Sequence, residues 1–327
     1  MIVCNEISDL FLRNENFVIT THISPDGDGL GSALALKRGL ESINKRAFIV
    51  NHSKTPKNLT FLLKSPSEIL SLKEYQEKKV KDEFVSVIVD MGCFERLGDV
   101  LSLIKKGKEL VVIDHHIVQV PENVFSLINT KASATGEVVF FLLEKLRISL
   151  SKDIAEPIYV AIETDTGGFR FSGTTPQTHV LVSKLLEKGV NPTYIYRELY
   201  EKESPIRIKV MGEVFSTLHL TPKGKIAFME LKQSMLKKLG AKIEDGDDLV
   251  NYLMIIEGVE VGFYFKEIDS SHTKVSCRSR GNFNLDNFLS KWGGGGHSQA
   301  AGLLMKENIS TTKSIIISNC IDIIENK

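Results

Sequence analysis

The first half of the chain alternates short apolar runs with amphipathic stretches. Runs that are apolar on both faces predict buried strands at 17–21, 47–50, 85–89 and 110–113. Apolar residues at helical spacing predict helices at 30–43, 95–106, 134–146, 153–163 and 177–188. Such alternation is typical of a parallel sheet with helices on both faces. We therefore expect an α/β N-terminal domain.

The last third of the chain follows a different pattern and predicts a smaller C-terminal α+β domain. Its β-rich runs predict strands at 225–231, 259–267 and 274–280. Its amphipathic stretches predict helices at 234–239, 249–253, 285–290 and 312–324. Because the helical pattern before it breaks at Ser204-Pro205, we expect a first domain over 1–188, a linker over 189–212 and a second domain over 213–327.

Composition and charge narrow the class of protein. With 327 residues, the chain is long enough for two domains that each bury a core. Its 41 basic residues balance 41 acidic ones, so no global field draws the protein onto nucleic acid or an anionic membrane. This excludes a protein that coats nucleic acid. It leaves open an enzyme whose local basic pocket binds short, diffusible phosphates.

Cysteine usage and the N-terminal segment predict a soluble, cytoplasmic protein with no membrane partner. Cys4, Cys93, Cys277 and Cys320 are far apart and form no CxxC pair, which argues against a disulfide framework or a zinc signature. Met1–Asn14 contains acidic residues and lacks the basic-then-apolar order of a signal peptide. The longest apolar runs are far shorter than the roughly 18 residues of a membrane span.

The segment HISPDGD follows the first predicted strand and carries candidate metal ligands. It offers one imidazole, His22, and two carboxylates, Asp26 and Asp28, that repel each other unless a cation lies between them. Gly27 and Gly29 would let the backbone turn tightly without a Cβ penalty. The alternative is a solvated Asp-Gly turn that follows a strand.

Three further segments end in side chains with catalytic potential. Asp90 ends the third predicted strand, where capping of the next helix is an equally good explanation. His115 and His116 follow Asp114 at the end of the fourth strand, and successive residues point in different directions, so one can bind a metal while the other reaches substrate. Asp165 follows a predicted helix and precedes a glycine turn; alone it is unremarkable.

The combination of these segments predicts a metal centre. In parallel sheets, ligands bind outside the carboxyl ends of the strands. Carboxylate with imidazole suits Mn²⁺, Zn²⁺ or Fe²⁺, whereas oxygen ligands alone would favour Mg²⁺ or Ca²⁺. Six ligands exceed the need of one catalytic ion, and two ions about 3.5–4 Å apart are usual for phosphate ester hydrolysis. The candidate ligands are His22, Asp26, Asp28, Asp90, His115 and Asp165.

The motifs HISPDGD, VDMG, DHH and TDTGGF, in this order, resemble those of the DHH phosphoesterase superfamily. The segment SCRSRGNFNLDNFLSKWGGGGHSQAAG resembles the DHH-associated C-terminal domain, so the resemblance covers nearly the whole chain. Within the superfamily, the compact two-domain form resembles the nanoRNase/3′-phosphoadenosine-5′-phosphate phosphatase group and the related cyclic dinucleotide phosphodiesterases.

The resemblance implies two ions in one active site, Mn²⁺ in the first instance and Mg²⁺ or another divalent ion as the alternative. His116 would contact the scissile phosphate and support the leaving group, and Asp90 would bridge the ions. The ligands implied are His22, Asp26 and Asp90 for the first ion, and Asp28, Asp90, His115 and Asp165 for the second.

The C-terminal motif implies a substrate-binding surface. Arg278 and Arg280 are two residues apart in a predicted strand, so they point to the same side, and a guanidinium group suits phosphate. Gly293–Gly296 would let backbone N–H groups approach an anion, although a flexible loop is the alternative. The resemblance implies substrate binding by Arg278, Ser279, Arg280, Gly294, Gly295, Gly296 and His297.

We therefore expect a two-metal phosphoesterase that hydrolyses short oligoribonucleotides to 5′-mononucleotides, 3′-phosphoadenosine 5′-phosphate to AMP, or both. The sequence is compatible with a homodimer. A cyclic di-adenosine monophosphate or linear dinucleotide phosphodiesterase shares every motif, and an inorganic pyrophosphatase or polyphosphatase is a further alternative. A non-catalytic nucleotide-binding regulator would normally lack a metal ligand, and none is missing here.

Overall fold

The computed structural model describes residues 5–80 and 82–325 and divides the chain into two compact units, Met1–Lys202 and Glu203–Lys327. We call them the N-terminal and C-terminal units. Cys4 lies outside the described residues. Much of the range 189–212, expected as a linker, is helical: it contains α8 (Pro192–Tyr200) and the first residues of α9 (Pro205–Phe215).

The N-terminal unit is built on a six-stranded sheet in which every recorded strand pair is parallel. This confirms the α/β prediction. The order reverses between β1 and β4, which is the position where open α/β sheets bind ligands. Across the sheet the strands are β3 (Ile69–Leu70), β2 (Arg46–Val50), β1 (Asn16–Thr20), β4 (Val85–Val89), β5 (Glu109–Asp114) and β6 (Phe125–Ile128).

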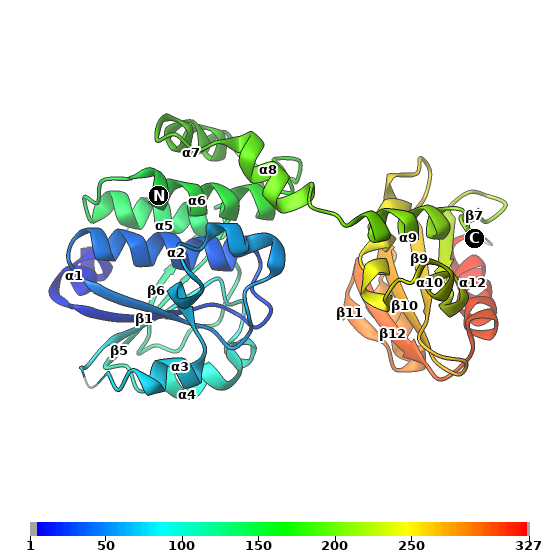
Figure 1. Ribbon diagram of the computed structural model, residues 1–327, viewed down its shortest axis with the longest axis horizontal. Helices are drawn as coiled ribbons and strands as arrows, with labels where there is room; N and C mark the ends of the chain where they lie inside the picture. The colour runs from blue at the N-terminus through cyan, green and yellow to red at the C-terminus, as the bar shows by residue number, and fades with distance from the viewer. Residues whose placement is uncertain (1–4, 81, 326–327) are drawn as a thin grey trace. The chain divides into compact units, whose positions relative to one another are not determined.

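Helices cover both faces of this sheet, as the apolar runs predict (Figure 1). Alternate residues of a strand point to opposite faces, so Phe17 and Ile19 join one core while Val18 joins the other. The core on the first face includes residues of α1 (Asn5–Arg13), α2 (Gly27–Ser42), α5 (Thr135–Lys145) and α6 (Lys152–Asp165), and α7 (Pro176–Glu187) packs against α6. Those on the second are α3 (Leu72–Glu77), η3 (Phe94–Val100) and α4 (Leu101–Ile104).

Two local features of this unit differ from the sequence prediction. The helix predicted over 95–106 is divided into η3 and α4, with Gly98 at φ 61° inside it. The edge strands β3 and β6 were not predicted, because they are short and only partly buried. Two further 3₁₀ segments are η1 (Lys57–Leu62) and η2 (Pro66–Glu68).

The C-terminal unit contains a second six-stranded sheet, which confirms the smaller α+β domain. The pair β8–β9 is parallel and the other recorded pairs are antiparallel. Across the sheet the strands are β11 (Gly295–His297), β12 (Ala300–Met305), β10 (Thr273–Ser279), β9 (Val261–Glu267), β8 (Ile226–Leu231) and β7 (His219–Leu220). The helices are α9, α10 (Gln233–Leu239), η4 (Ile243–Gly246), η5 (Leu249–Ile255), α11 (Leu285–Leu289), η6 (Ser290–Trp292) and α12 (Ile309–Ile324).

The sequence prediction missed β11 and β12, because β11 is Gly-Gly-His, β12 begins Ala-Ala-Gly, and neither contains a β-branched residue. The predicted helix over 249–253 is the 3₁₀ segment η5. Within the described ranges, the structure contains no helix of the length and apolar character that a membrane span requires.

Candidate metal centre

The six candidate ligands lie at one edge of the first sheet. His22, Asp90 and His115 follow the carboxyl ends of β1, β4 and β5. Asp26 and Asp28 flank the first residue of α2, and Asp165 ends α6. Four chain segments thus converge where a parallel sheet presents its ligand site.

His22, Asp26 and Asp90 form one group whose potential ligand atoms all lie within 4.8 Å of one another. The Nε2 atom of His22 lies 3.6 Å from Asp26 Oδ2 and 3.5 Å from Asp90 Oδ2. Asp26 also caps α2, since its Oδ1 accepts hydrogen bonds from the backbone N–H groups of Asp28 and Gly29. The other oxygen of Asp26 is therefore directed at His22 by the start of the helix.

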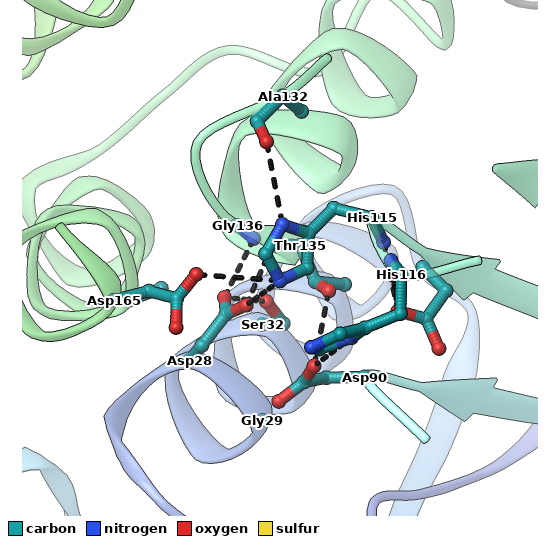
Figure 2. Close-up of polar contacts among 12 residues, drawn as sticks. Asp28, Gly29, Ser32, Asp90, His115, His116, Ala132, Thr135, Gly136 and Asp165 are labelled. Atoms are coloured by element: carbon teal, nitrogen blue, oxygen red, sulfur yellow. Dashed lines mark hydrogen bonds and ion pairs between the residues drawn. The ribbon is translucent and has the colours of Figure 1, made fainter. Parts of the chain in front are cut away.

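Asp28, His115 and Asp165 form a second group of the same kind. His115 Nε2 lies 3.8 Å from Asp28 Oδ2 and 3.3 Å from Asp165 Oδ2, as Figure 2 shows. The carbonyl oxygen of Ala132 lies 3.3 Å from His115 Nδ1. Because a carbonyl can only accept a hydrogen bond, Nδ1 is the nitrogen that carries the hydrogen. The buried Nε2 of His115 faces these two carboxylates yet makes no hydrogen bond to any described residue, which conflicts with the rule that buried polar atoms have partners. A bound cation resolves this conflict, so the residues fit a metal.

Asp90 belongs to the first group and also to a third, with His115 and His116. It is 3% exposed and its backbone has φ 52°, which is rare for a residue with a side chain. The capping explanation does not apply, because Cys93 is the N-cap of the next helical segment. Strain of this kind persists where the surrounding structure holds it, and it accumulates at functional sites.

Asp28 is held by the start of α5. Its two oxygens accept hydrogen bonds from the backbone N–H groups of Thr135 (2.7 Å) and Gly136 (2.9 Å), while Ser32 donates its hydroxyl at 3.2 Å. Burial raises the pKa of Asp28 well above its usual range, and the nearby charges of Asp90 and Asp165 raise this pKa further. A buried carboxylate in this setting favours a nearby cation.

Two histidines at this edge take up protons that balance the carboxylates. Burial opposes protonation of His22, but hydrogen bonds with Asp26 and Asp90 outweigh it and raise its pKa to about 10. Hydrogen bonds with Asp114 and Asp90 raise the pKa of His116 to about 10. Burial opposes ionisation of Asp90, yet hydrogen bonds from His116 and His22 lower its pKa.

Asp114 is the positioning residue that the sequence interpretation did not assign. It is fully buried, and one of its oxygens accepts hydrogen bonds from the backbone N–H groups of His115 and His116 and from His116 Nδ1 at 2.9 Å. Its other oxygen accepts from the N–H groups of Met91 and Gly92, next to Asp90. Asp114 therefore ties the two strand ends together. Its position before two histidines was the available signal.

Gly27 of HISPDGD and Gly29, which follows the motif, serve close packing rather than a tight turn. Gly27 and Gly29 are the first and third residues of α2, and neither has a positive φ. A Cβ on Gly29 would lie 2.3 Å from the Thr21 hydroxyl oxygen and 3.1 Å from Asp90 Oδ2. Glycine is required there because the helix approaches the end of β1 and Asp90 so closely.

The predicted substrate-binding residues lie in the C-terminal unit around β10 and β11. Arg278 donates to Asn251 Oδ1 (3.0 Å) and to the Cys277 carbonyl (2.9 Å), and Arg280 donates to the Met254 carbonyl. Ser279 is buried and donates to the Phe283 carbonyl at 2.9 Å.

The glycine cluster forms ordered backbone contacts in this unit. The N–H groups of Gly293 and Gly294 bond to the Ser290 and Leu289 carbonyls, and that of Gly296 bonds to Asp286. Gly295, Gly296 and His297 form β11. These N–H groups already have acceptors, so an anion-binding role for the glycines would depend on their missing side chains.

Comparison with known proteins agrees with this architecture. Residues 16–162 match the DHH family, N-terminal domain, and residues 230–319 match the DHHA1 domain. The chain is 32% identical over 288 residues to the bifunctional oligoribonuclease and PAP phosphatase NrnA of Thermus thermophilus, covering 88% of this chain and 83% of that protein. It is 28% identical over 294 residues to the protein of the same name from Bacillus subtilis, covering 88% of each.

The crystal structure of an exopolyphosphatase-related protein from Bacteroides fragilis is also similar. It matches with a TM-score of 0.84 and 27% identity, over 97% of this chain and 95% of that one. The carboxylate and imidazole groups at the sheet edge and the similarity to these relatives support the same conclusion. The chain belongs to the DHH family of divalent-metal-dependent phosphoesterases and carries a DHHA1 domain in its C-terminal unit.

Proposed function

We propose that this protein is a two-metal, Mn²⁺-dependent enzyme that hydrolyses short oligoribonucleotides to 5′-mononucleotides and 3′-phosphoadenosine 5′-phosphate to AMP. The two-metal proposal rests on two ligand groups that lie at one edge of the first sheet. Asp90 belongs to one group, and its charge acts on Asp28 of the other. The names of the Thermus thermophilus and Bacillus subtilis relatives support the substrate classes. We place the protein in the cytoplasm.

The proposed ligands divide between the two ions. His22, Asp26 and Asp90 would hold the first, and Asp28, His115 and Asp165 would hold the second. Asp90, whose charge acts on Asp28, would be shared between the two ions. Such ions would supply an activated water molecule and neutralise charge on the phosphate and the departing oxygen. Carboxylates combined with imidazoles are compatible with Mn²⁺, whereas oxygen ligands alone would favour Mg²⁺ or Ca²⁺.

His116 is the proposed catalytic acid. Asp114 accepts from its Nδ1, which fixes the ring and leaves Nε2 to act on substrate. In the metal-free protein, hydrogen bonds with Asp114 and Asp90 raise the pKa of His116 to about 10, which favours the protonated ring. The His116 side chain is 48% exposed, so it can meet a substrate and give the leaving oxygen a proton.

The proposed substrate contacts in the C-terminal unit are Arg278, Arg280 and His297. Ser279 supports the loop that follows β10, since its hydroxyl donates to the Phe283 carbonyl. Gly294, Gly295 and Gly296, which let the backbone pack closely beside His297, complete the proposed substrate-binding set. Short nucleotides are the proposed partners, together with a second copy of the chain in a homodimer.

Two alternatives have a specific basis. A cyclic di-adenosine monophosphate or linear dinucleotide phosphodiesterase would use the same metal ligands. An inorganic polyphosphatase or pyrophosphatase is suggested by the word "exopolyphosphatase-related" in the description of the Bacteroides fragilis structure. Neither alternative accounts for the two NrnA relatives.

A substrate panel tests the proposal. The purified full chain with Mn²⁺ is assayed on a pentaribonucleotide, 3′-phosphoadenosine 5′-phosphate, cyclic di-adenosine monophosphate, its linear form, a single-stranded DNA and pyrophosphate. We expect kcat/KM to be highest for the pentaribonucleotide and 3′-phosphoadenosine 5′-phosphate, and at least about tenfold lower for the cyclic and inorganic compounds. A preference for the cyclic compound or for pyrophosphate would replace the proposal with the corresponding alternative.

A further inference from the structure

Arg96 is an exposed arginine whose guanidinium group lies at the carboxyl edge of the first sheet. It belongs to η3, which follows Asp90 along the chain. Its Nη2 atom lies 3.0 Å from Nδ1 of His22, a proposed metal ligand. The backbone fixes this position, because the N–H group of Ile23 donates to the Arg96 carbonyl at 2.6 Å. The segment after β4 therefore holds an arginine against the segment after β1.

The contact with His22 does not satisfy the guanidinium group. Nδ1 of His22 also lies 2.8 Å from the carbonyl oxygen of Ile23, and a carbonyl can only accept, so Nδ1 carries a hydrogen. All nitrogens of an arginine side chain are donors. Because two donors form no hydrogen bond with each other, Nη2 of Arg96 lacks an acceptor at this contact. A histidine that binds a metal usually donates its other ring N–H to such a partner, so a bound ion would leave this arrangement unchanged.

Arg96 also lacks a carboxylate that neutralises its charge. Within residues 5–80 and 82–325, its side chain forms no ion pair and no other hydrogen bond. Asp26 and Asp90 pair instead with Nε2 of His22, the ring nitrogen that Arg96 does not contact. Since arginine stays protonated in proteins, a permanent positive charge is exposed to solvent beside the first ligand group.

The neighbouring Gly92 leaves part of the guanidinium group uncovered. Gly92 has φ 68°, and a Cβ at this position would lie 3.5 Å from Arg96 Nη1. A larger side chain would therefore lie against Nη1, whereas glycine leaves this nitrogen free. Both terminal nitrogens of Arg96 can thus donate to an incoming anion. Two N–H groups on one planar group suit the oxygens of a phosphate, which arginine binds in parallel.

Arg96 and His116 approach Asp90 from two sides. The His22 ring that Arg96 contacts lies 3.5 Å from Asp90 Oδ2, and Nδ1 of His116 lies 3.4 Å from Asp90 Oδ1. The order of the strands that carry these residues, β1, β4 and β5, gives the same arrangement. A phosphate held at Asp90 would therefore have a proton donor on one side and a guanidinium group on the other.

We propose that Arg96 donates hydrogen bonds to the non-bridging oxygens of the phosphate that is hydrolysed, and that it is a catalytic residue together with His116. The inference rests on the proposed function and adds to it a residue of the N-terminal unit that contacts substrate. Negative charge on these oxygens must be neutralised during phosphoryl transfer, and a guanidinium group is one of the means that enzymes use.

Replacement of the Arg96 side chain tests the contact, since the carbonyl that fixes the loop is kept. On the compound of the substrate panel that the original chain hydrolyses best, Arg96→Gln with Mn²⁺ should lower kcat/KM by about 10²-fold. We expect both a higher KM and a lower kcat, because the contact strengthens as charge develops. Arg96→Lys keeps the charge without the planar group and should lose only about tenfold. A value for Arg96→Gln within about threefold of the original would overturn the inference.

Mn²⁺ binding distinguishes contact with substrate from support of a metal ligand. Arg96 offers no ligand atom, so a calorimetric Mn²⁺ titration of the full chain should give a Kd within about threefold of the original in Arg96→Gln. If Mn²⁺ binding weakens in proportion to kcat/KM, Arg96 only supports His22 and the inference is wrong.

Binding of inorganic phosphate to the Mn²⁺-loaded full chain tests the contact without turnover. The Kd should rise about tenfold in Arg96→Gln, because a charge-assisted hydrogen bond is lost. This result would support the contact even if the preferred substrate is not the proposed one. An unchanged Kd would overturn the contact and leave the proposed hydrolysis intact.

Arg147→Gln is the matched control. Arg147 is another exposed arginine that forms no ion pair within the described ranges. It follows the C-terminal end of α5, whereas the first residues of this helix donate to Asp28. Its replacement should leave phosphate binding and hydrolysis unchanged, and circular dichroism should show all three variants folded.

Discussion

The carboxyl edge of the first sheet and the open face of the second carry opposite kinds of charge. The first gathers Asp28 and Asp90, both nearly fully buried, beside a histidine nitrogen that lacks a donor. The second gathers Lys266, Lys274 and Arg278 around one cavity that also contains Asp247 and Asp248. A net charge of zero over the chain therefore conceals an acidic region in one unit and a region richer in cations in the other. Under the proposed function, each region would bind a ligand of the opposite sign.

Among the substitutions that we predict, Asp90→Ala should reduce hydrolysis most, because Asp90 lies in two of the candidate ligand groups. We expect kcat/KM for the pentaribonucleotide with Mn²⁺ to fall by more than about 10³-fold, since the loss of even one electrostatic donor costs an active site about 10²–10³-fold. Steady-state kinetics and a Mn²⁺ binding titration measure the loss.

The matched control is Asp99→Ala, which removes a carboxylate that pairs with His52 outside the ligand groups. Circular dichroism should show both variants folded. Full hydrolysis by Asp90→Ala would contradict the two-metal site, whereas an equal loss in Asp99→Ala would point to a general effect on the N-terminal unit.

The metal-free protein should lose stability as the pH rises from 6 to 9, and the Mn²⁺-loaded protein should not. The pKa of His22 is raised to about 10, so its contribution is fully present below the unfolded pKa of about 6.5 and is lost as the pH rises through 10. The raised pKa of Asp28 acts in the same direction from about pH 4 upward, and the lowered pKa of Asp90 matters only at acid pH.

The size of this effect follows from the same shifts. A change of one in a pKa corresponds to about 1.4 kcal/mol, and each kcal/mol moves the melting temperature of a domain of this size by roughly 2–4 °C. Between pH 6 and 9 the His22 shift corresponds to about 3.4 kcal/mol, so we expect the difference in melting temperature between metal-loaded and metal-free protein to widen by roughly 10 °C in calorimetric scans. A constant difference would show that protons do not balance the carboxylates in the absence of metal.

The clustering of the candidate ligands at one edge of the first sheet was largely predictable from the sequence, because the carboxyl ends of parallel strands must share an edge. Apolar runs located β1, β4 and β5, and the polar residue after each run marked a candidate ligand. Asp114 was not predictable in the same way, since its task is to accept four backbone N–H groups and a ring nitrogen that only the folded loops bring together. The need for Gly29 was predicted for the wrong reason, because close packing against Thr21 is a tertiary contact.

The open face of the second sheet was less predictable. The glycine-rich segment was interpreted as backbone that approaches an anion, with a flexible loop as the alternative, yet pairing with β12 makes part of it an edge strand, which its glycines do not predict. Tyr264, Lys266 and Lys274 were invisible as a group because they lie on two strands and meet only through their register. Arg278 and Arg280, treated together from their spacing, line two different cavities.

This separation of the arginines leads to the smallest effect that we predict. Arg278→Lys keeps a positive charge but loses the planar guanidinium group. In the original chain this group donates to Asn251 and to the Cys277 carbonyl through Nε and Nη1, which leaves Nη2 for the substrate. We expect KM for the 5′-phosphorylated pentaribonucleotide to rise about tenfold, or about 1.4 kcal/mol, with kcat within about twofold because the contact is the same in the ground and transition states.

Arg280→Lys is the comparison variant, because Arg280 directly follows β10 and lies two residues from Arg278. Arg280 donates to the Met254 carbonyl and lines the cavity that contains Lys225 and Lys291, so its replacement should raise KM by less than about threefold. Equal effects of the two replacements would mean that the arginines act on substrate as a pair, as their spacing in the sequence suggests. A larger fall in kcat than rise in KM for Arg278→Lys would instead assign this arginine to the transition state, and the open face would then contribute to chemistry as well as to binding.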